Sequence, residues 1–314
     1  MKRMLISPYF GRLPNYFQLF LDSCELNDGF TDFLVVTDDQ TRYRVPANVQ
    51  VVNMSFADFN QLVTHKLGFE FPVTSPYKIC DYRPAFGKIF EDYLKGYDFW
   101  GHVDTDMILG NLSNFLSPDV FEQFDRLLER GALMFYRNTA SINELFSEKI
   151  DGIVNFGDAV RTKEPCFYDE IMFPALLKHR GYKTYSNTRY ADILPQYFDF
   201  TIDAHCDIEN QPQQYFVYKQ GVGVFQGVGD NENVNECMYV HIQKRPMEVG
   251  AYESSTVVYL QENSISAKRS DSRITKEARR AWRFNYLKKQ LNKLDWNHIR
   301  IHLRTRMVRR RIEW

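Results

Sequence analysis

Short apolar runs alternate with segments of helical periodicity along the first half of the chain. The runs that predict strands are residues 3–7, 33–37 and 49–54. One helix is predicted to open at Pro14, and another to run from a capping pair of Ser55 and Asp58 to Leu67. Strands that alternate with helices in this way favour a mostly parallel sheet.

A fourth apolar strand begins at Tyr97 and ends abruptly in two acids, Asp104 and Asp106. It follows a predicted helix that carries an apolar side at Phe86, Ile89, Phe90, Tyr93 and Leu94. Acids at the carboxyl end of such a strand face the crevice at the edge of a sheet. Two aspartates one residue apart can offer oxygens to one divalent cation, of the kind that Mg²⁺ and Mn²⁺ prefer. The alternative interpretation is a solvated turn after a strand.

The second half of the chain is predicted to be richer in strands and loops. A helix is expected from Ser117-Pro118 through Leu128, and another from Tyr168 to His179, with residues 138–165 between them as an irregular, mobile loop. The predicted strands are residues 132–136, 215–218, 222–225, 238–242 and 256–260. Gly221, Gly223, Gly227 and Gly229 follow no strand–turn–helix pattern, so they predict a flexible turn and not a phosphate loop.

Length and composition allow a sizeable core, because 44% of the 314 residues are hydrophobic. One α/β domain with a tail and a pair of domains both fit this length. The five cysteines form neither a CxxC pair nor a metal spacing, which is typical of reduced thiols in a cytosolic protein. The apolar run at the start is too short for a signal peptide, and nothing approaches the roughly 20 apolar residues of a membrane span. We therefore expect a cytoplasmic protein.

The charge of the chain is strongly asymmetric. Residues 266–314 hold 16 Lys and Arg against 4 Asp and Glu, so this tail carries +12 and the body carries −13. An apolar stripe at helical spacing runs through Ala281, Phe284, Leu287, Leu291 and Leu294, and Trp296, Ile299, Leu303 and Met307 continue a similar pattern. A basic amphipathic helix can dock on its own acidic body, lie on an anionic bilayer or bind nucleic acid. No nucleic-acid motif is present. We favour binding of the tail to the inner face of the plasma membrane.

Several motifs together resemble those of a GT-A type glycosyltransferase, in particular small bacterial transferases for capsule and surface polysaccharides. They are residues 6–11, 37–39, 77–84, 102–106 and 241–244. The resemblance covers about residues 1–260. It implies a Rossmann-like mixed sheet flanked by helices over residues 1–265, with a nucleotide-binding half at 1–110 and an acceptor half at 111–265. It also implies a hexosyltransferase that uses Mn²⁺ or Mg²⁺, a UDP-linked sugar as donor, and a glycan or lipid-linked glycan as acceptor.

The resemblance assigns the metal site to three residues. Asp106 contacts the metal, Asp104 contacts the metal or the ribose, and His241 completes the site. Lys244 then meets the β-phosphate of the donor. The usual glycine between the histidine and the lysine, and the usual Lys-Pro-Trp ending, are absent, because Lys244 is followed by Arg245-Pro246.

Further candidates for donor binding lie near the ends of the early strands. They are Pro8 and Tyr9 for the base, Asp38 for the base or ribose, Lys78 and Arg83 for phosphate, and Asp81 for the base or ribose. Ordinary structural roles explain the same residues: a packed aromatic for Tyr9, an Asx turn for Asp38, and a surface ion pair at a helix end for the other three.

Asp169 and Glu170 are the candidates for a base that deprotonates the acceptor hydroxyl in an inverting transfer. Acids in the first turn of a helix are also expected without any catalytic role. The stereochemistry stays open, and so do two other functions. One is a sugar-phosphate nucleotidyltransferase, although the glycine-rich loop expected after its first strand is missing. The other is an inactive binding protein that its basic tail recruits.

Overall fold

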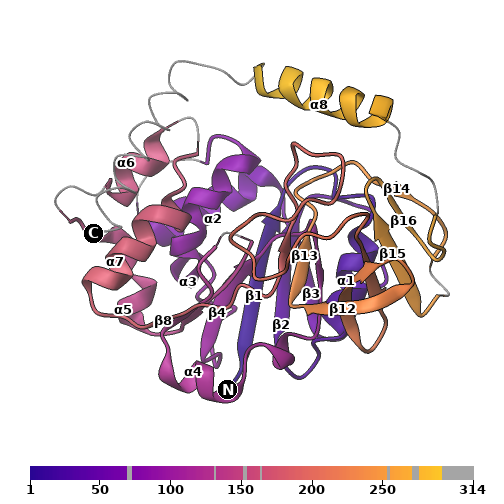
Figure 1. Ribbon diagram of the computed structural model, residues 1–314. Coiled ribbons are helices and arrows are strands. Elements are labelled where there is room, and N and C mark those ends of the chain that lie inside the picture. Colours follow the sequence, from indigo (N-terminus) through magenta and orange to yellow (C-terminus); the bar gives the residue numbers. More distant parts are fainter. Residues whose placement is uncertain are drawn as a thin grey trace.

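A seven-stranded sheet runs through the centre of the body (Figure 1). In spatial order its strands are β3 (Val49–Asn53), β2 (Asp32–Thr37), β1 (Arg3–Tyr9), β4 (Phe99–Val103), β7 (Leu133–Arg137), β6 (Arg126–Leu127) and β8 (Thr184–Tyr185). The computed structural model describes residues 1–68, 73–130, 132–150, 154–162, 165–252, 255–270 and 276–291. The first four strands are parallel neighbours, whereas β7 is antiparallel to both β4 and β6. The sheet is therefore mixed, and the early strands are the parallel part that the sequence predicts.

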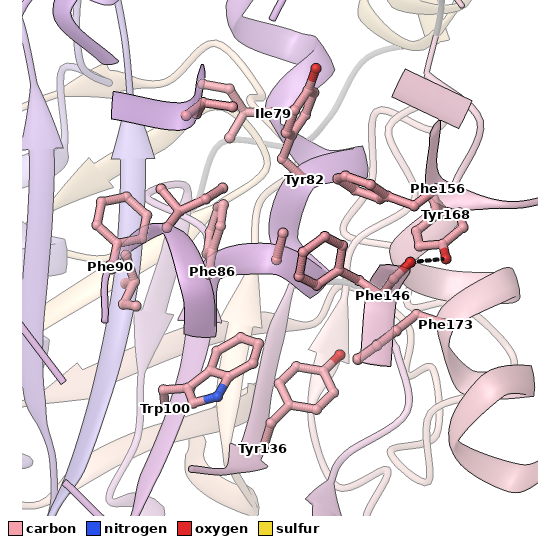
Figure 2. Packing of buried hydrophobic residues seen from close by; sticks show 14 of the residues in the cluster. Ile79, Tyr82, Phe86, Phe90, Trp100, Tyr136, Phe146, Phe156, Tyr168 and Phe173 are labelled. Carbon is pink, nitrogen blue, oxygen red and sulfur yellow. Dashed lines mark hydrogen bonds between the residues drawn. The ribbon is translucent and has the colours of Figure 1, made fainter. Parts of the chain in front are cut away.

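Helices cover one face of this sheet and enclose an aromatic core. They are α2 (Phe56–Leu67), a 3₁₀ helix at Pro76–Ala85, α3 (Phe86–Ile89), α5 (Ala140–Asn143), a 3₁₀ turn at Leu145–Ser147, α6 (Phe156–Arg161), a π-helical turn at Tyr168–Met172 and α7 (Phe173–His179). Figure 2 shows Phe86, Trp100 and Tyr136 packed among aromatic side chains from these helices, with the Tyr168 hydroxyl donating to the Phe146 carbonyl at 3.0 Å. Alternate residues of β1, β2 and β7 face this core, as strand geometry requires.

The opposite face of the sheet packs on α1 (Phe17–Glu25), α4 (Pro118–Gln123) and a small three-stranded sheet. The strands of that small sheet are β5 (Met107–Leu109), β13 (Tyr239–His241) and β9 (Ala191–Asp192). A further six-stranded sheet follows, in the order β12 (Asn231–Cys237), β11 (Gly223–Val228), β10 (Tyr215–Lys219), β15 (Val257–Gln261), β16 (Ser264–Ser266) and β14 (Glu248–Val249). Apolar residues of the two outer sheets and of α1 form one shared core.

Most of the predicted elements are present, with shifted ends. The capping role of Ser55 is confirmed, since its hydroxyl accepts from the Asp58 amide at 3.1 Å. The predicted helix from Pro14 begins later, at Phe17. The turn expected at residues 8–11 is partly strand, because Pro8 and Tyr9 still pair with Val36 and Thr37 of β2.

Three predictions about helices and loops are wrong in part. The helix expected through Leu128 ends at Gln123, because Arg126 and Leu127 pair with β7 and β8 instead. The helix expected through Leu94 ends at Ile89. The described parts of 138–165 form α5, α6 and a 3₁₀ turn, whose buried members include Ile142 and Phe156. Burial of these side chains against the helical core gives the segment regular structure.

The glycine-rich segment also differs from the expected flexible turn. Gly223 and Gly227 are residues of β11. A side chain at Gly227 would meet the ring of Tyr215 at 2.4 Å, so only glycine fits there without movement of the ring. Gly221 and Gly229 do sit in turns with positive φ angles, of 72° and 56°.

The predicted tail helix is present as α8 (Lys276–Leu291). Figure 1 shows α8 lying across one end of the body. The expected continuation through Leu294, Trp296, Ile299, Leu303 and Met307 lies outside the described residues. In the part of the chain that the structure describes, no helix is long and apolar enough to span a bilayer.

Candidate metal and nucleotide site

Asp104 and Asp106 follow the carboxyl end of strand β4, at the edge of the central sheet. All five residues of β4 are buried, and Asp104 follows it directly, with its amide donating to the Ala132 carbonyl at 2.9 Å. The chain then turns through Asp106 into β5. The register between β5 and β13 places His241 opposite Met107, and the Ile242 amide donates to the Asp106 carbonyl at 2.9 Å. Strand pairing therefore brings the late histidine beside the second aspartate.

Asp104, Asp106 and His241 converge on one point. One ligand atom from each lies within 4.8 Å of the others. The carboxylate of Asp106 is buried and lies 3.4 Å from Nε2 of His241. Burial raises the pKa of Asp106, but His241 and then Lys244 outweigh burial and lower that pKa to about 2. Burial likewise lowers the pKa of His241, but Asp106 and Asp192 raise it well above the usual 6.5.

Asp192 orients the imidazole of His241 from its other side. Strand β9 pairs with β13, so Asp192 is level with His241, and its carboxylate lies 3.0 Å from Nδ1 of the ring. The side-chain amide of Gln243 donates to the same carboxylate at 2.6 Å. A carboxylate that accepts from Nδ1–H leaves the lone pair of Nε2 directed at the aspartates, as in many histidine–metal sites. Two carboxylates and one such imidazole are a ligand set that fits Mn²⁺.

Arg83 joins this cluster to Asp169. One guanidinium nitrogen contacts Asp104, and another lies 3.0 Å from the carboxylate of Asp169. Burial raises the pKa of Asp169 to about 8, against the lowering effect of Arg83. Asp169 is buried within the π-helical turn, whereas its neighbour Glu170 is exposed. Of the two predicted catalytic acids, Glu170 is therefore the more exposed to solvent.

Lys78 and Asp81 form a fully buried ion pair at a distance of 2.6 Å. The ammonium group of Lys78 also donates to the Ala159 carbonyl and the Thr162 hydroxyl, both at 2.8 Å. The carboxylate of Asp81 accepts from the amides of Cys166 and Tyr168, at 2.8 and 2.9 Å. This pair ties the 3₁₀ helix at Pro76–Ala85 to the segment before α7. Neither side chain has exposed surface to offer to a phosphate or a ribose, so we give both a structural role.

The carboxyl end of β1 carries the remaining early candidates. Tyr9 is half-buried, and burial, then Asp106 and Asp39, raise the pKa of its hydroxyl, which lies near the candidate metal ligand Asp106. Pro8 precedes it in the strand. Asp38 accepts from the Gly11 amide at 2.7 Å, so its carboxylate also holds the loop after β1. Gly11 itself has a φ of 96°, which favours glycine.

Lys244 lies on the exposed side of the cluster. Its ammonium group is 4.9 Å from the ring centroid of Tyr77, an aromatic residue that is 59% exposed. Gln243 and Lys244 both adopt left-handed backbone conformations, with φ of 55° and 54°. Two such residues in succession are costly and occur where the surrounding structure holds them.

Sequence reasoning missed three residues of this site. The acid Asp192 ends the two-residue strand β9, which is too short to give a periodic signal. Tyr77 is part of a motif but carried no assigned role. Tyr16 is buried beside α1, and its hydroxyl has no hydrogen-bond partner within the described residues. Burial, and then Asp106 and Tyr9, raise the pKa of that hydroxyl, so a donor without a partner among the described residues lies close to the candidate metal ligand Asp106.

The structure thus defines a mixed α/β protein with a carboxylate–imidazole cluster at the edge of its central sheet. The chain belongs to DUF6625, a family of unknown function, whose model matches residues 5–269. No curated protein matches the sequence.

Two solved structures of LgtC are similar to the chain at a low level. An active-site mutant of LgtC shares 12% identity, with 77% of this chain and 86% of that chain covered and a TM-score of 0.39. The galactosyltransferase LgtC in complex with donor and acceptor sugar analogs shares 9% identity, with 62% and 76% covered and a TM-score of 0.30. Likeness at this level carries no conclusion about activity.

Proposed function

We propose that this protein is a metal-dependent glycosyltransferase of the GT-A type that moves a hexose from a UDP-linked sugar to a glycan or lipid-linked glycan. The observation that carries the proposal is the convergence of Asp104, Asp106 and His241 at the carboxyl edge of parallel strands. That edge is where open α/β sheets bind nucleotides. Polysaccharide biosynthesis, as for a capsule, is the process in which we place the reaction.

Asp104, Asp106 and His241 are the residues that would hold Mn²⁺ or Mg²⁺. Such a cation, when bound, supplies positive charge to a diphosphate leaving group. The orientation of His241 by Asp192 supports this assignment, because it presents Nε2 to the two carboxylates.

The chain also offers its own charges to the donor. Lys244 lies near enough to Asp106 to lower its pKa and is exposed, so it can approach a diphosphate bound at the cluster. Arg83 contacts Asp104 and provides a second cation on the same side. Pro8, Tyr9 and Asp38, at and beyond the ends of β1 and β2, are the residues we assign to the nucleoside.

Glu170 is our candidate for the base that removes the acceptor proton in an inverting transfer. It is exposed and lies one residue from Asp169, whose carboxylate is already engaged by Arg83. A base needs access to the acceptor hydroxyl. We therefore assign base catalysis to Glu170 and the positioning of Arg83 to Asp169.

An anionic bilayer is the partner that we propose for the tail, with the protein peripheral on the cytoplasmic face. In α8, Phe284 and Leu287 are 67% and 51% exposed, and Arg280 and Arg283 lie one turn before them. Apolar side chains flanked by arginine are the composition of helices that lie in the interface of a membrane. A lipid-linked acceptor would be presented at that surface.

The test is incubation of the purified protein with a panel of sugar nucleotides, with Mn²⁺ or with EDTA. The release of nucleoside diphosphate is measured, and UTP with sugar phosphates is tested in parallel for release of pyrophosphate. We expect nucleoside diphosphate release that needs the metal and that Asp106→Asn abolishes. Turnover that persists in EDTA, or pyrophosphate release from UTP, would contradict the proposal.

A further inference from the structure

The helix α8 has an inner face that is docked on the body. The indole N–H of Trp282 donates to the Pro195 carbonyl at 3.0 Å, and its ring packs edge-on against Phe198 with centroids 5.6 Å apart. Arg279, one turn earlier, forms an ion pair with Asp199 at 3.0 Å. The docking site of α8 is therefore the loop of residues 193–201.

Trp282 also stacks on Arg245, whose guanidinium lies 4.6 Å from the indole ring. Arg245 is almost wholly buried, and its guanidinium donates to four backbone carbonyls, those of Phe198, Tyr197, Glu262 and Leu194, at 2.6, 2.7, 2.9 and 3.5 Å. One side chain thus joins the turn at 242–245, the loop at 193–201 and the end of β15. Trp282 covers this junction from outside.

Two of the three joined segments directly follow His241 and Asp192, the residue that orients it. The loop at 193–201 follows Asp192, which orients His241. The turn at 242–245 follows His241 itself and contains Gln243 and Lys244, both in left-handed conformations. Strained backbone persists only where neighbouring contacts hold it, and Arg245 is the next residue in the chain.

We infer that α8 braces the metal site, with Trp282 as a positioning residue that acts through Arg245 on the turn carrying Lys244 and on the loop after Asp192. This inference rests on the proposed function, because Mn²⁺ and UDP are the ligands whose binding it concerns. It gives the tail helix two faces with separate roles: Trp282 points to the body, and Phe284 points away from it. Displacement of α8 from the body then weakens the binding of the donor diphosphate.

The test compares three variants of the full chain: Trp282→Ala, Trp282→Phe and Phe284→Ala. Mn²⁺ affinity is measured by electron paramagnetic resonance, and UDP affinity at saturating Mn²⁺ by calorimetry, below the unfolding temperature of each variant. We expect Trp282→Ala to weaken UDP binding by about 2- to 30-fold, the range over which residues that contact neither ligand can change the coupling between sites. Trp282→Phe keeps an aromatic ring over Arg245 and restores most of the affinity. Phe284→Ala, on the outer face of the same helix, binds as the wild type does.

Amide hydrogen exchange provides a readout that needs no ligand. Trp282→Ala is expected to raise exchange in residues 193–201 and 242–247, and Phe284→Ala is not. Unchanged exchange in these two segments, or equal loss of UDP affinity in Trp282→Ala and Phe284→Ala, would show that Trp282 does not position them. A wild-type protein that binds neither Mn²⁺ nor UDP would overturn the proposed function instead, and the exchange result would still decide the brace.

Discussion

Arg83 and Asp104 form an ion pair beside the candidate metal ligands Asp106 and His241. Asp104 is at the same time one of the three groups whose ligand atoms converge. A guanidinium and a divalent cation compete for one carboxylate, because each is stabilised by the same negative charge. Arg83 is therefore the internal counter-cation of Asp104.

Removal of this competing cation should tighten the binding of metal alone. We expect Arg83→Gln to bind Mn²⁺ about 5- to 150-fold more tightly in the absence of nucleotide, the range of ordinary coupling between two ligands. UDP binding should weaken, because a cation near the diphosphate is lost. Electron paramagnetic resonance and calorimetry measure the two affinities. Arg180→Gln, which breaks an exposed ion pair with Glu148, is the control. Mn²⁺ binding that is unchanged or weaker in Arg83→Gln would refute the competition.

The carboxylate of Asp192 should matter to metal binding although it is not a predicted ligand. Asp192→Asn removes the negative acceptor 3.0 Å from Nδ1 of His241. The loss of such a partner commonly costs about 10- to 100-fold in metal affinity, and we expect a loss of that size. Asp203→Asn is a matched control, because Asp203 lies 2.9 Å from Nδ1 of a different histidine, His205. Equal effects of the two substitutions would argue against a role for Asp192 in orienting the ligand.

The fall of stability with rising pH above 6.5 should become weaker when metal is added. In the metal-free protein, Asp106 and Asp192 raise the pKa of His241 above 6.5, against the effect of burial. Between 6.5 and that raised pKa the folded state holds a proton that the unfolded state does not, so stability is greatest below pH 6.5 and falls as the pH rises. Metal binding requires neutral His241, so Mn²⁺ affinity rises with pH over the same window.

Urea unfolding at a series of pH values measures how the free energy of unfolding changes with pH, both with and without Mn²⁺. His241→Gln should flatten the slope of the metal-free protein between pH 6.5 and 8 and remove the stabilisation by Mn²⁺. A slope that His241→Gln leaves unaltered would show that a different group is responsible.

The buried pair of Lys78 and Asp81 should act on stability. Asp81→Ala leaves the ammonium group of Lys78 buried without its carboxylate, and breaking a buried pair in this way costs about 3–5 kcal/mol. Loss of the exposed pair in Arg180→Gln should cost about 0–1 kcal/mol. The free energy of unfolding in urea distinguishes the two variants. A Lys78→Gln variant that keeps full stability but loses UDP affinity would restore the phosphate role that the sequence predicts.

The outer face of α8 should bind anionic vesicles. We expect the double variant Phe284→Ala, Leu287→Ala to sediment at least about tenfold less with liposomes that contain phosphatidylserine, because each buried apolar side chain contributes about 1.5–3 kcal/mol. Added salt should weaken the binding of the wild type, through screening of its arginines. Val222→Ala, at an exposed apolar residue outside the tail, is the control. Equal sedimentation of the wild type and the double variant would end the membrane proposal for this face.

Local periodicity explains which features could be predicted without a structure. The buried strands β1, β2 and β4 are continuous apolar runs, because both faces of the sheet are covered. Asp104 and Asp106 stand out because acids interrupt such a run at its carboxyl end. The six-residue helix α4 was predicted too long, because nothing in the apolar spacing of Phe121, Phe124 and Leu127 shows that the chain turns into a strand at Arg126.

By itself the amino-acid sequence determined the parallel β/α beginning of this protein, the pair of acids that ends β4, and the basic helix of its tail. The tertiary structure decided the rest of the site. His241 meets Asp106 and Asp192 only because β13 pairs with β5 on one side and with β9 on the other. Lys78 and Asp81 prove to be buried only once the segment before α7 is placed over them. These contacts join residues tens of positions apart, and the pairing of short strands is set by long-range packing that no local pattern encodes.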